Sequence, residues 1–297
     1  MRKNKRVHSW LAFAIMACCL SAFAAAPNFD YRKTGMALQI ASDTVTDGVR
    51  TVDLSFADVP DIDGSSHRTA AYRVLPAGGT SRHAAILFVH WLDDSPDANR
   101  TQFLAQAKEL APLGVESFLI ETMWSDPKWF EGRKPAEDLA NSVLQVKRLR
   151  RALDVLLTSR DIDRSRVAYV GHDFGAMFGA VLAGNDRRVH AWALQAGTTS
   201  FSDWYLFAPK QESAAREAFV AKLSALDPVR FIGRAAPAPV LLQFGRTDRY
   251  VSVAKAQSFF DAAAEPKTLR WYDAGHALNA DAISDRMQWL RTQLKIQ

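Results

Sequence analysis

The chain has 297 residues, of which 48% are hydrophobic, so it is long enough to bury the core of one large α/β domain or two small ones. Its formal net charge is +5, but four of the 37 basic residues fall within the first six positions, and the first acidic residue is Asp30. The remaining 33 basic residues face 32 acidic ones, a balance that argues against a nucleic-acid partner.

The first 26 residues have the pattern of a secretory signal: basic residues, an apolar run and then the small residues of SAFAAAP. We expect residues 1–26 to be removed on export to the periplasm or the medium, leaving a mature domain over 27–297. A less favoured alternative treats IMAC at 15–18 as a lipoprotein signal with Cys18 lipidated. Cys18 and Cys19 are the two cysteines of the chain, so no disulfide is expected in the mature domain. No later segment reaches the ~18 apolar residues that a membrane span requires.

Two strands of alternating hydrophobicity are predicted to form an antiparallel hairpin near the start of the mature chain. Val52, Leu54 and Phe56 alternate with polar neighbours, and TAAYRVL at 69–75 follows a turn rich in Asp, Gly and Ser. From residue 84 onward, continuously apolar segments alternate with helical ones, which is typical of a parallel sheet covered on both faces. The predicted strands of this sheet are 84–89, 115–120, 166–170, 189–194, 239–244 and 268–272.

The longest predicted helix spans 136–158, where Leu139, Val143, Val146 and Leu149 recur at steps of three and four residues. Further helices are expected at 98–112, 174–184, 213–225, 252–263 and 281–295. No internal repeat or low-complexity linker interrupts the chain, so the mature part is expected to form one domain. The oligomeric state stays open.

The sequence VGHDFG at 170–175 places an aspartate in the pattern Gly-x-Nuc-x-Gly, which usually carries a nucleophilic serine. Because the motif joins a predicted strand to a predicted helix, the chain must turn sharply there, and Gly171 and Gly175 leave room for the turn. The turn would direct Asp173 outward at the carboxyl edge of the sheet, beside the positive end of the helix. Alternatively, Asp173 serves only as the N-cap of that helix. His172 is interpreted as a residue that supports the elbow rather than as a second base.

Two further candidates follow in the order nucleophile, acid, base. LLQFGRTDRYV places Asp248 just after a predicted strand, and LRWYDAGHALN places His276 in the loop after the next one. Each also has a structural interpretation, Asp248 as the start of a helix and His276 as an ordinary loop histidine. The occurrence of all three residues at the ends of the expected strands favours a catalytic triad.

With these motifs the sequence resembles the α/β-hydrolase superfamily from about residue 50 to 296. ALDPVRFI, APVLLQFGRTDRYVS and DAGHALN are similar to the dienelactone hydrolase and prolyl-oligopeptidase-like branch, whereas VGHDFG resembles epoxide hydrolases and haloalkane dehalogenases, whose nucleophile is an aspartate. The resemblance implies an α/β-hydrolase fold with a mostly parallel sheet, helices on both faces and a short lid. It also implies the triad Asp173, His276 and Asp248.

The same resemblance implies an oxyanion hole formed by the amide of Phe174 and by one amide from the loop after residue 89. Relatives have His-Gly in this loop, where the present sequence has Trp91 after the histidine. Either Trp91 or Leu92 is expected to supply the second amide.

Three aromatic residues are candidates for the substrate pocket, namely Trp124, Trp204 and Tyr205. Trp204 is a hypothetical donor to a leaving halide and Tyr205 a hypothetical acid for a leaving oxygen, and ordinary packing is the alternative for all three. The seven histidines are scattered, and no phosphate-binding loop with a following lysine occurs. The sequence therefore predicts a small-molecule substrate and neither a metal nor another cofactor.

An aspartate at the elbow favours attack on an alkyl carbon over attack on an ester. A carboxylate is ionised at neutral pH and can displace a halide or open an epoxide, whereas its attack on an ester would give a mixed anhydride. The leading hypothesis is therefore an aspartyl-ester intermediate on Asp173. The alternatives are a carboxylester hydrolase of the dienelactone hydrolase type and a catalytically inactive binding protein that retained the fold.

Overall fold

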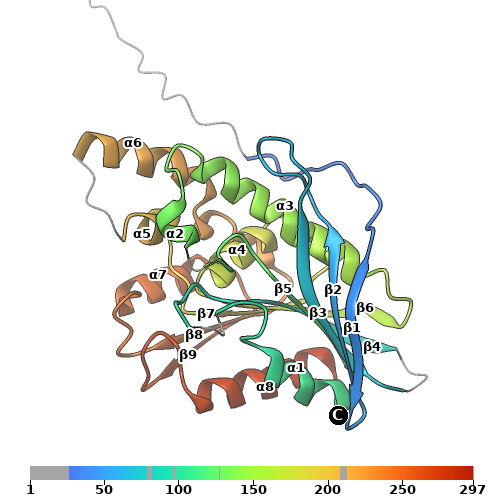
Figure 1. The fold of residues 1–297 in the computed structure, drawn as a ribbon. Helices are drawn as coiled ribbons and strands as arrows, with labels where there is room; N and C mark the ends of the chain where they lie inside the picture. Colours follow the sequence, from blue (N-terminus) through green and yellow to red (C-terminus); the bar gives the residue numbers. More distant parts are fainter. Residues whose placement is uncertain (1–26, 79–81, 96–97, 127, 208–212, 297) are drawn as a thin grey trace, which may run out of the picture.

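The structure, a computed structural model, describes residues 27–78, 82–95, 98–126, 128–207 and 213–296; the predicted signal at 1–26, including Cys18, lies outside them. A mixed sheet of nine strands in the order β1-β2-β3-β5-β4-β6-β7-β8-β9 forms its centre (Figure 1). The antiparallel strands are β1 (Gln39–Thr46), β2 (Val49–Ala57) and β3 (Arg68–Pro76). The mutually parallel strands are β4 (His83–Val89), β5 (Val115–Ile120), β6 (Ile162–His172), β7 (Ala191–Gln195), β8 (Val240–Gly245) and β9 (Lys267–Tyr272).

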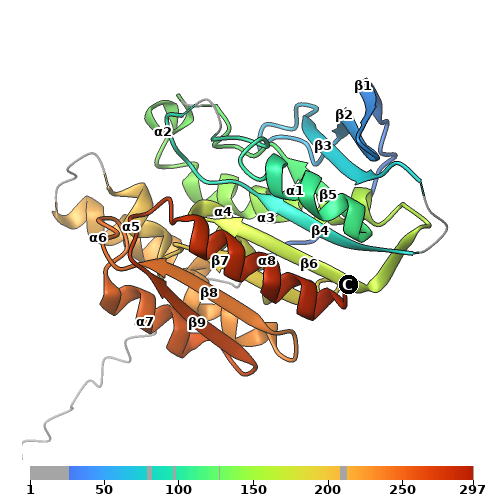
Figure 2. The ribbon, with the colours of Figure 1, turned by 90° about the horizontal axis from the view of Figure 1, so that it is seen from below.

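Helices cover both faces of this sheet. The helices are α1 (Leu104–Leu110), α2 (Trp129–Gly132), α3 (Asp138–Leu156), α4 (Phe174–Ala183), α5 (Phe201–Tyr205), α6 (Ser213–Leu223), α7 (Val253–Ala262) and α8 (Ala280–Leu294). Side chains alternate along β4, so that Leu87 and Val89 join a core with α3, α4 and α7, whereas Ile86 and Phe88 join a second core with α1 and α8. Figure 2 shows α1 and α8 together on their face of the sheet. Among the described residues no helix is long and apolar enough to cross a membrane.

The predicted hairpin and the parallel sheet are confirmed, with shifts of a few residues at their ends. β2 and β3 pair in antiparallel register, with Leu54 opposite Ala71. The first strand, β1, was not predicted, because all eight of its residues are exposed and it therefore lacks the alternation that a buried face imposes. α1 begins at Leu104 rather than at residue 98, because turns occupy the preceding residues.

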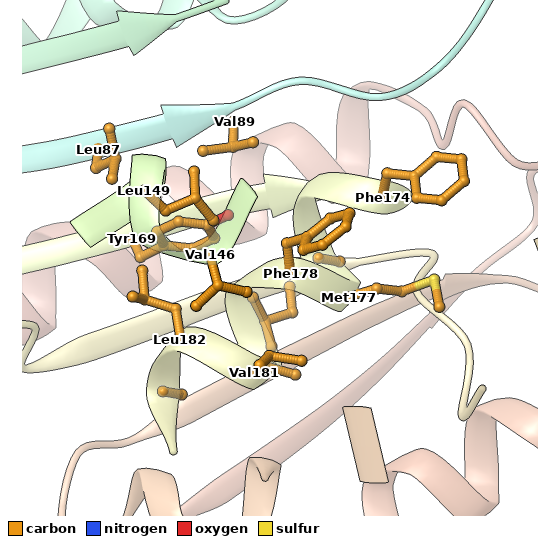
Figure 3. Close-up of a cluster of buried hydrophobic side chains, with 14 of the residues drawn as sticks. Leu87, Val89, Val146, Leu149, Tyr169, Phe174, Met177, Phe178, Val181 and Leu182 are labelled. Carbon is orange, nitrogen blue, oxygen red and sulfur yellow. The ribbon is translucent and has the colours of Figure 1, made fainter. Parts of the chain in front are cut away.

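The elbow between β6 and α4 rests on a tightly packed core. Every residue of α4 is buried, and Figure 3 shows Phe178 of this helix near Tyr169 and Val146, with Phe174 beyond it at the start of the helix. The hydroxyl of Tyr169 in β6 donates a hydrogen bond of 2.7 Å to the carbonyl of Gly175 in α4. This bond and the burial of α4 hold the elbow against the sheet, which is what a preorganised site requires.

Replacing Gly175 with alanine is expected to destabilise the fold by about 2 kcal/mol or more. A Cβ at this position would lie 2.3 Å from the carbonyl oxygen of Val89, and backbone of a central strand cannot move away cheaply. Chemical denaturation measures the effect, with Gly132→Ala as the matched control because a Cβ there meets nothing within 4 Å. Equal stability of the two variants would contradict the close approach of helix and strand.

Candidate active site

Asp173 occupies the tip of the elbow, in a backbone conformation that non-glycine residues rarely adopt. It joins β6 to α4 with φ 56° and ψ −117°. Such strain persists only where the surrounding structure enforces it, and it is concentrated at functional sites. The side chain makes no cap hydrogen bond to α4. The interpretation of Asp173 as a simple N-cap is therefore wrong.

The carboxyl group of Asp173 is buried, with its two oxygens in different environments. Oδ2 accepts a hydrogen bond of 3.0 Å from the amide of Leu92, whereas Oδ1 has no hydrogen-bond partner among the described residues. The side chain is 2% exposed, and it lines a cavity at the carboxyl edge of the sheet. One oxygen is thus held by the backbone, and the other remains available to react.

His276 and Asp248 form a hydrogen-bonded pair at the same cavity. The Nδ1 atom of His276 lies 2.8 Å from Oδ2 of Asp248, in the loops that follow β9 and β8. The other carboxylate oxygen of Asp248 accepts hydrogen bonds from the amides of Tyr250 and Val251. Because a carboxylate can only accept, Nδ1 carries the proton and Nε2 is left unprotonated in the neutral ring. Ser252, not Asp248, caps α7.

No direct hydrogen bond joins His276 to Asp173, although both line the cavity. Burial raises the pKa of Asp173 to about 7, while the charge of His276 and the amides of Leu92 and Phe174 oppose the rise. Burial by itself lowers the pKa of His276, but its hydrogen bond to Asp248 and the negative charges of Asp173 and Asp248 raise it above the usual value. The two side chains therefore form a coupled acid and base pair.

The amide of Leu92, rather than that of Trp91, faces Asp173. The amide of Trp91 donates instead to Oε1 of Gln102 at 3.0 Å. The Phe174 amide also favours the ionised form of the Asp173 carboxyl group and so opposes the rise of its pKa, although Oδ1 has no hydrogen-bond partner among the described residues. The structure thus places Phe174 and Leu92 at the carboxyl group, and it leaves Trp91 out of the expected pair of donors.

A cavity of about 600 Å³ opens above Asp173. Its wall includes the Trp204 side chain, as predicted, and Trp91. Its other aromatic lining residues are Phe130, Phe174, Phe207 and Tyr250, and its charged lining residues are Asp93, Asp94, Glu131 and Arg249 apart from Asp173 and His276. Six aromatic side chains, together with more acidic than basic groups in the lining, favour uncharged substrates over anionic ones.

Two of the predicted pocket residues lie elsewhere. Trp124 is 1% exposed, and its indole N–H donates to the carbonyl of His90. The hydroxyl of Tyr205 is hydrogen-bonded to Ser142 at 2.8 Å. Both side chains pack against the ring of Phe174 instead of lining the cavity, and their polar ends find partners in the protein interior. The role of Tyr205 as an acid is therefore wrong.

A larger groove of about 730 Å³ lies along α8 and is lined by residues such as Glu109, Ser284 and Arg291. Its described lining residues include no buried nucleophile and no histidine, so the smaller cavity is the candidate active site. Among the described residues no group of three or more His, Cys, Asp or Glu side chains is arranged to hold a metal ion.

No protein-family model matches the sequence, and no curated protein matches it. Solved structures do match. An acetyl xylan esterase from Paenibacillus sp. superposes with a TM-score of 0.67 at 17% identity, covering 88% of this chain and 90% of that one. An acetyl xylan esterase from Thermoanaerobacterium sp. superposes with a TM-score of 0.65 at 17% sequence identity, covering 88% of each chain.

A protein from Klebsiella pneumoniae assigned as a dienelactone hydrolase gives a TM-score of 0.58 at 13% identity, covering 83% of this chain and 98% of that one. At such low identity the likeness speaks for architecture and not for chemistry. The mixed sheet with its antiparallel N-terminal strands, the helices on both faces and these neighbours show that the chain has the α/β-hydrolase fold.

Proposed function

We propose that the protein is a hydrolase in which Asp173 displaces a leaving group from an alkyl carbon. The observation that carries this proposal is the asymmetry of the Asp173 carboxyl group, whose Oδ2 is held by the Leu92 amide while Oδ1 lacks a partner. In the first step Oδ1 forms a bond to the carbon, and the carbon–halogen bond breaks with the electron pair leaving on the halide. The product is an ester of Asp173.

In the second step His276 takes a proton from water through Nε2, and the resulting hydroxide attacks Cγ of the ester. Negative charge then develops on Oδ2, next to the amides of Leu92 and Phe174. Collapse of this intermediate breaks the bond between Cγ and the alkyl oxygen, and His276 returns its proton to the departing alcohol. The lack of a direct bond between His276 and Asp173 suits this step, because a water molecule must act between them.

Esterification also alters the electrostatics of His276. While Asp173 is ionised, its charge helps to raise the pKa of His276 and so favours the imidazolium form, which cannot act as a base. Formation of the ester removes this charge. The pKa of His276 then falls, and the neutral base becomes available when hydrolysis requires it.

Two indole groups favour halide displacement over epoxide opening. Nε1 of Trp91 and Nε1 of Trp204 are buried without an acceptor, and both residues line the cavity. An indole N–H is a donor only, so it can bind a departing halide but cannot protonate an alkoxide. The best-supported substrates are small uncharged haloalkanes. Epoxides are second, with Tyr250 in place of Tyr205 as the phenol that lines the cavity.

A carboxylester hydrolase is the second candidate function, because the structural neighbours include acetyl xylan esterases. In that case His276 would activate water directly and Asp173 would only orient it. The Leu92 amide speaks against this assignment, because it is already bonded to Asp173 and does not await the carbonyl oxygen of an ester.

The rate with an uncharged substrate is expected to fall below about pH 7, roughly tenfold per pH unit. The reason is the raised pKa of Asp173, since only the ionised carboxylate can attack. The pH profile of kcat/KM measures this limb. A rate that stays constant down to about pH 5, where an ordinary aspartate is still mostly ionised, would contradict the assignment of Asp173 as a buried nucleophile.

A single turnover in heavy-oxygen water separates the candidate functions. Haloalkanes, epoxides and esters are each incubated with an equimolar amount of enzyme, and the peptide containing residue 173 is analysed by mass spectrometry. Label in Asp173 supports the covalent ester, because water attacks its Cγ. Turnover with label only in the product favours direct attack by water, and no turnover of any class favours a binding protein.

A further inference from the structure

We propose that His172 and Gln102 act as positioning residues that tie the loop carrying Leu92 to the loop carrying His276. His172 is buried and Gln102 is partly buried. Neither residue lines the cavity, so neither touches the expected substrate or the reacting atoms. This inference refines the proposed function, but its central claim, the state of the His172 ring, is tested below without any substrate.

A chain of three hydrogen bonds joins the two loops. The amide of Trp91 lies 3.0 Å from Oε1 of Gln102, and Nε2 of Gln102 lies 2.7 Å from Nδ1 of His172. Nε2 of His172 lies 3.0 Å from the carbonyl oxygen of His276. Gln102 comes from the turn before α1 and His172 ends β6, so segments far apart in the sequence meet here.

The two backbone groups at the ends of this series of hydrogen bonds, the Trp91 amide and the His276 carbonyl, determine the direction of all three bonds. A backbone amide can only donate, so Gln102 must present its oxygen to Trp91 and its NH₂ group to His172. Nδ1 of His172 must therefore accept, and the proton of the ring lies on Nε2. That proton is donated to the carbonyl oxygen of His276, which can only accept. A neutral His172 with its proton on Nε2 satisfies all three bonds.

Burial favours the same neutral form. His172 is 1% exposed, and burial, together with the nearby charges of His276 and Arg286, lowers its pKa well below the usual value. A protonated Nδ1 would face the NH₂ group of Gln102, two donors in contact. His172 is therefore suited to hold its neighbours in place and not to exchange protons during the reaction.

The position of Trp91 follows from this arrangement. Its indole stacks on His172 with ring centroids 4.8 Å apart and lies nearly parallel to His276 at 6.2 Å. The indole stands where the relatives have glycine, and it packs beside the rings of His172 and His276 while still lining the cavity. Movement of His172 would therefore disturb Leu92, through the backbone of Trp91, and the orientation of His276 toward Asp248.

The first test is nitrogen NMR of the histidine rings in the substrate-free protein. His172 is expected to stay neutral, with its proton on Nε2, at neutral pH and on acidification past the point where an ordinary histidine is protonated. Its signals are assigned by their loss in His172→Gln. A ring protonated on Nδ1, alone or together with Nε2, near neutral pH would overturn the proposal. Because no substrate is used, this outcome is independent of whether Asp173 forms an ester.

The second test compares two replacements that each keep one bond of the ring. His172→Gln can place its amide nitrogen near the former Nε2 and keep the bond to His276, whereas His172→Asn reaches only the position of Nδ1. We expect the pKa of His276 to fall in His172→Asn, because its bond to Asp248 weakens, and to change little in His172→Gln. With a turned-over substrate, kcat should fall about 10- to 100-fold in His172→Asn with little change in KM.

Thermal unfolding of both variants separates positioning from a purely structural role. Similar melting temperatures combined with a different His276 pKa support the proposal. Equal losses of stability and equal pKa changes in both variants would refute it, as would an unchanged His276 pKa in His172→Asn.

Discussion

Replacing His276 with glutamine is expected to stop the reaction after one alkylation of each enzyme molecule. Ionised Asp173 needs no base to attack a haloalkane, so the first step should persist, whereas hydrolysis of the ester depends on the proton that Nε2 removes from water. We expect multiple turnover to fall by about 1,000-fold or more, with one equivalent of halide released rapidly. Intact-protein mass spectrometry should then show the alkyl group on the enzyme, at the peptide containing Asp173.

His190→Gln provides the control, because His190 is an exposed histidine outside the cavity whose amide donates a hydrogen bond to the carbonyl of Val167. It should neither trap an ester nor change turnover. If His276→Gln abolishes the first release of halide as well, then His276 takes part in the attack itself. That result would favour direct activation of water and count against the aspartyl ester.

Much of this site could be predicted from the sequence because its key residues belong to local patterns. The elbow follows from two glycines around Asp173 between an apolar strand and an apolar helix. Asp248 and His276 follow from their positions just after predicted strands, since parallel strands deliver their carboxyl ends to one edge of the sheet. Element type is the property that periodicity reveals well, whereas the order of the strands in the sheet emerges only from the structure.

Side-chain direction could not be predicted in the same way. Trp124 and Tyr205 occupy the expected loops, yet their polar ends bind His90 and Ser142 in the interior. Tyr250 was missed as a cavity residue, although it lies two positions after Asp248 and its ring is 5.0 Å from that of His276. A sequence shows which loop carries a residue, but the neighbours met in three dimensions decide which way it points.

The role of Gln102 could not be predicted from the sequence either. It lies 70 residues from His172 in the sequence, in a turn with no recognisable motif. Its importance comes from the direction of hydrogen bonds to two other segments, and those directions depend on tertiary structure. Only the suspicion that His172 supports the elbow was accessible from the sequence.

Asp173→Asn is expected to abolish turnover while making the protein more stable at alkaline pH. The neutral amide is a far weaker nucleophile than a carboxylate, so the rate should fall by about 10,000-fold or more. Asparagine can still direct its oxygen to the Leu92 amide, which keeps the elbow intact. The gain in stability follows from the cost of burying an ionised carboxylate.

The sign of the stability effect depends on pH. Asp173 has a folded-state pKa raised to about 7, compared with about 4 in an unfolded chain. Relative to the asparagine variant, the wild type therefore loses stability as the pH rises from about 4 to about 7, because folding opposes ionisation in that window. Above about pH 7 this pH-dependent difference in the free energy of unfolding between the two proteins should be constant, at most about 4 kcal/mol.

Chemical denaturation of both proteins at about pH 4.5 and pH 8.5 measures this difference. Asp94→Asn is the control, because Asp94 is an exposed carboxylate at the same cavity. Asp173→Asn should gain stability relative to the wild type between the two pH values, and Asp94→Asn should not. A gain of the same size at both pH values would show that the elbow carboxylate ionises normally. A reactive anion held in a buried, strained turn lowers the stability of the fold, so loss of activity and gain of stability should appear together in this one substitution.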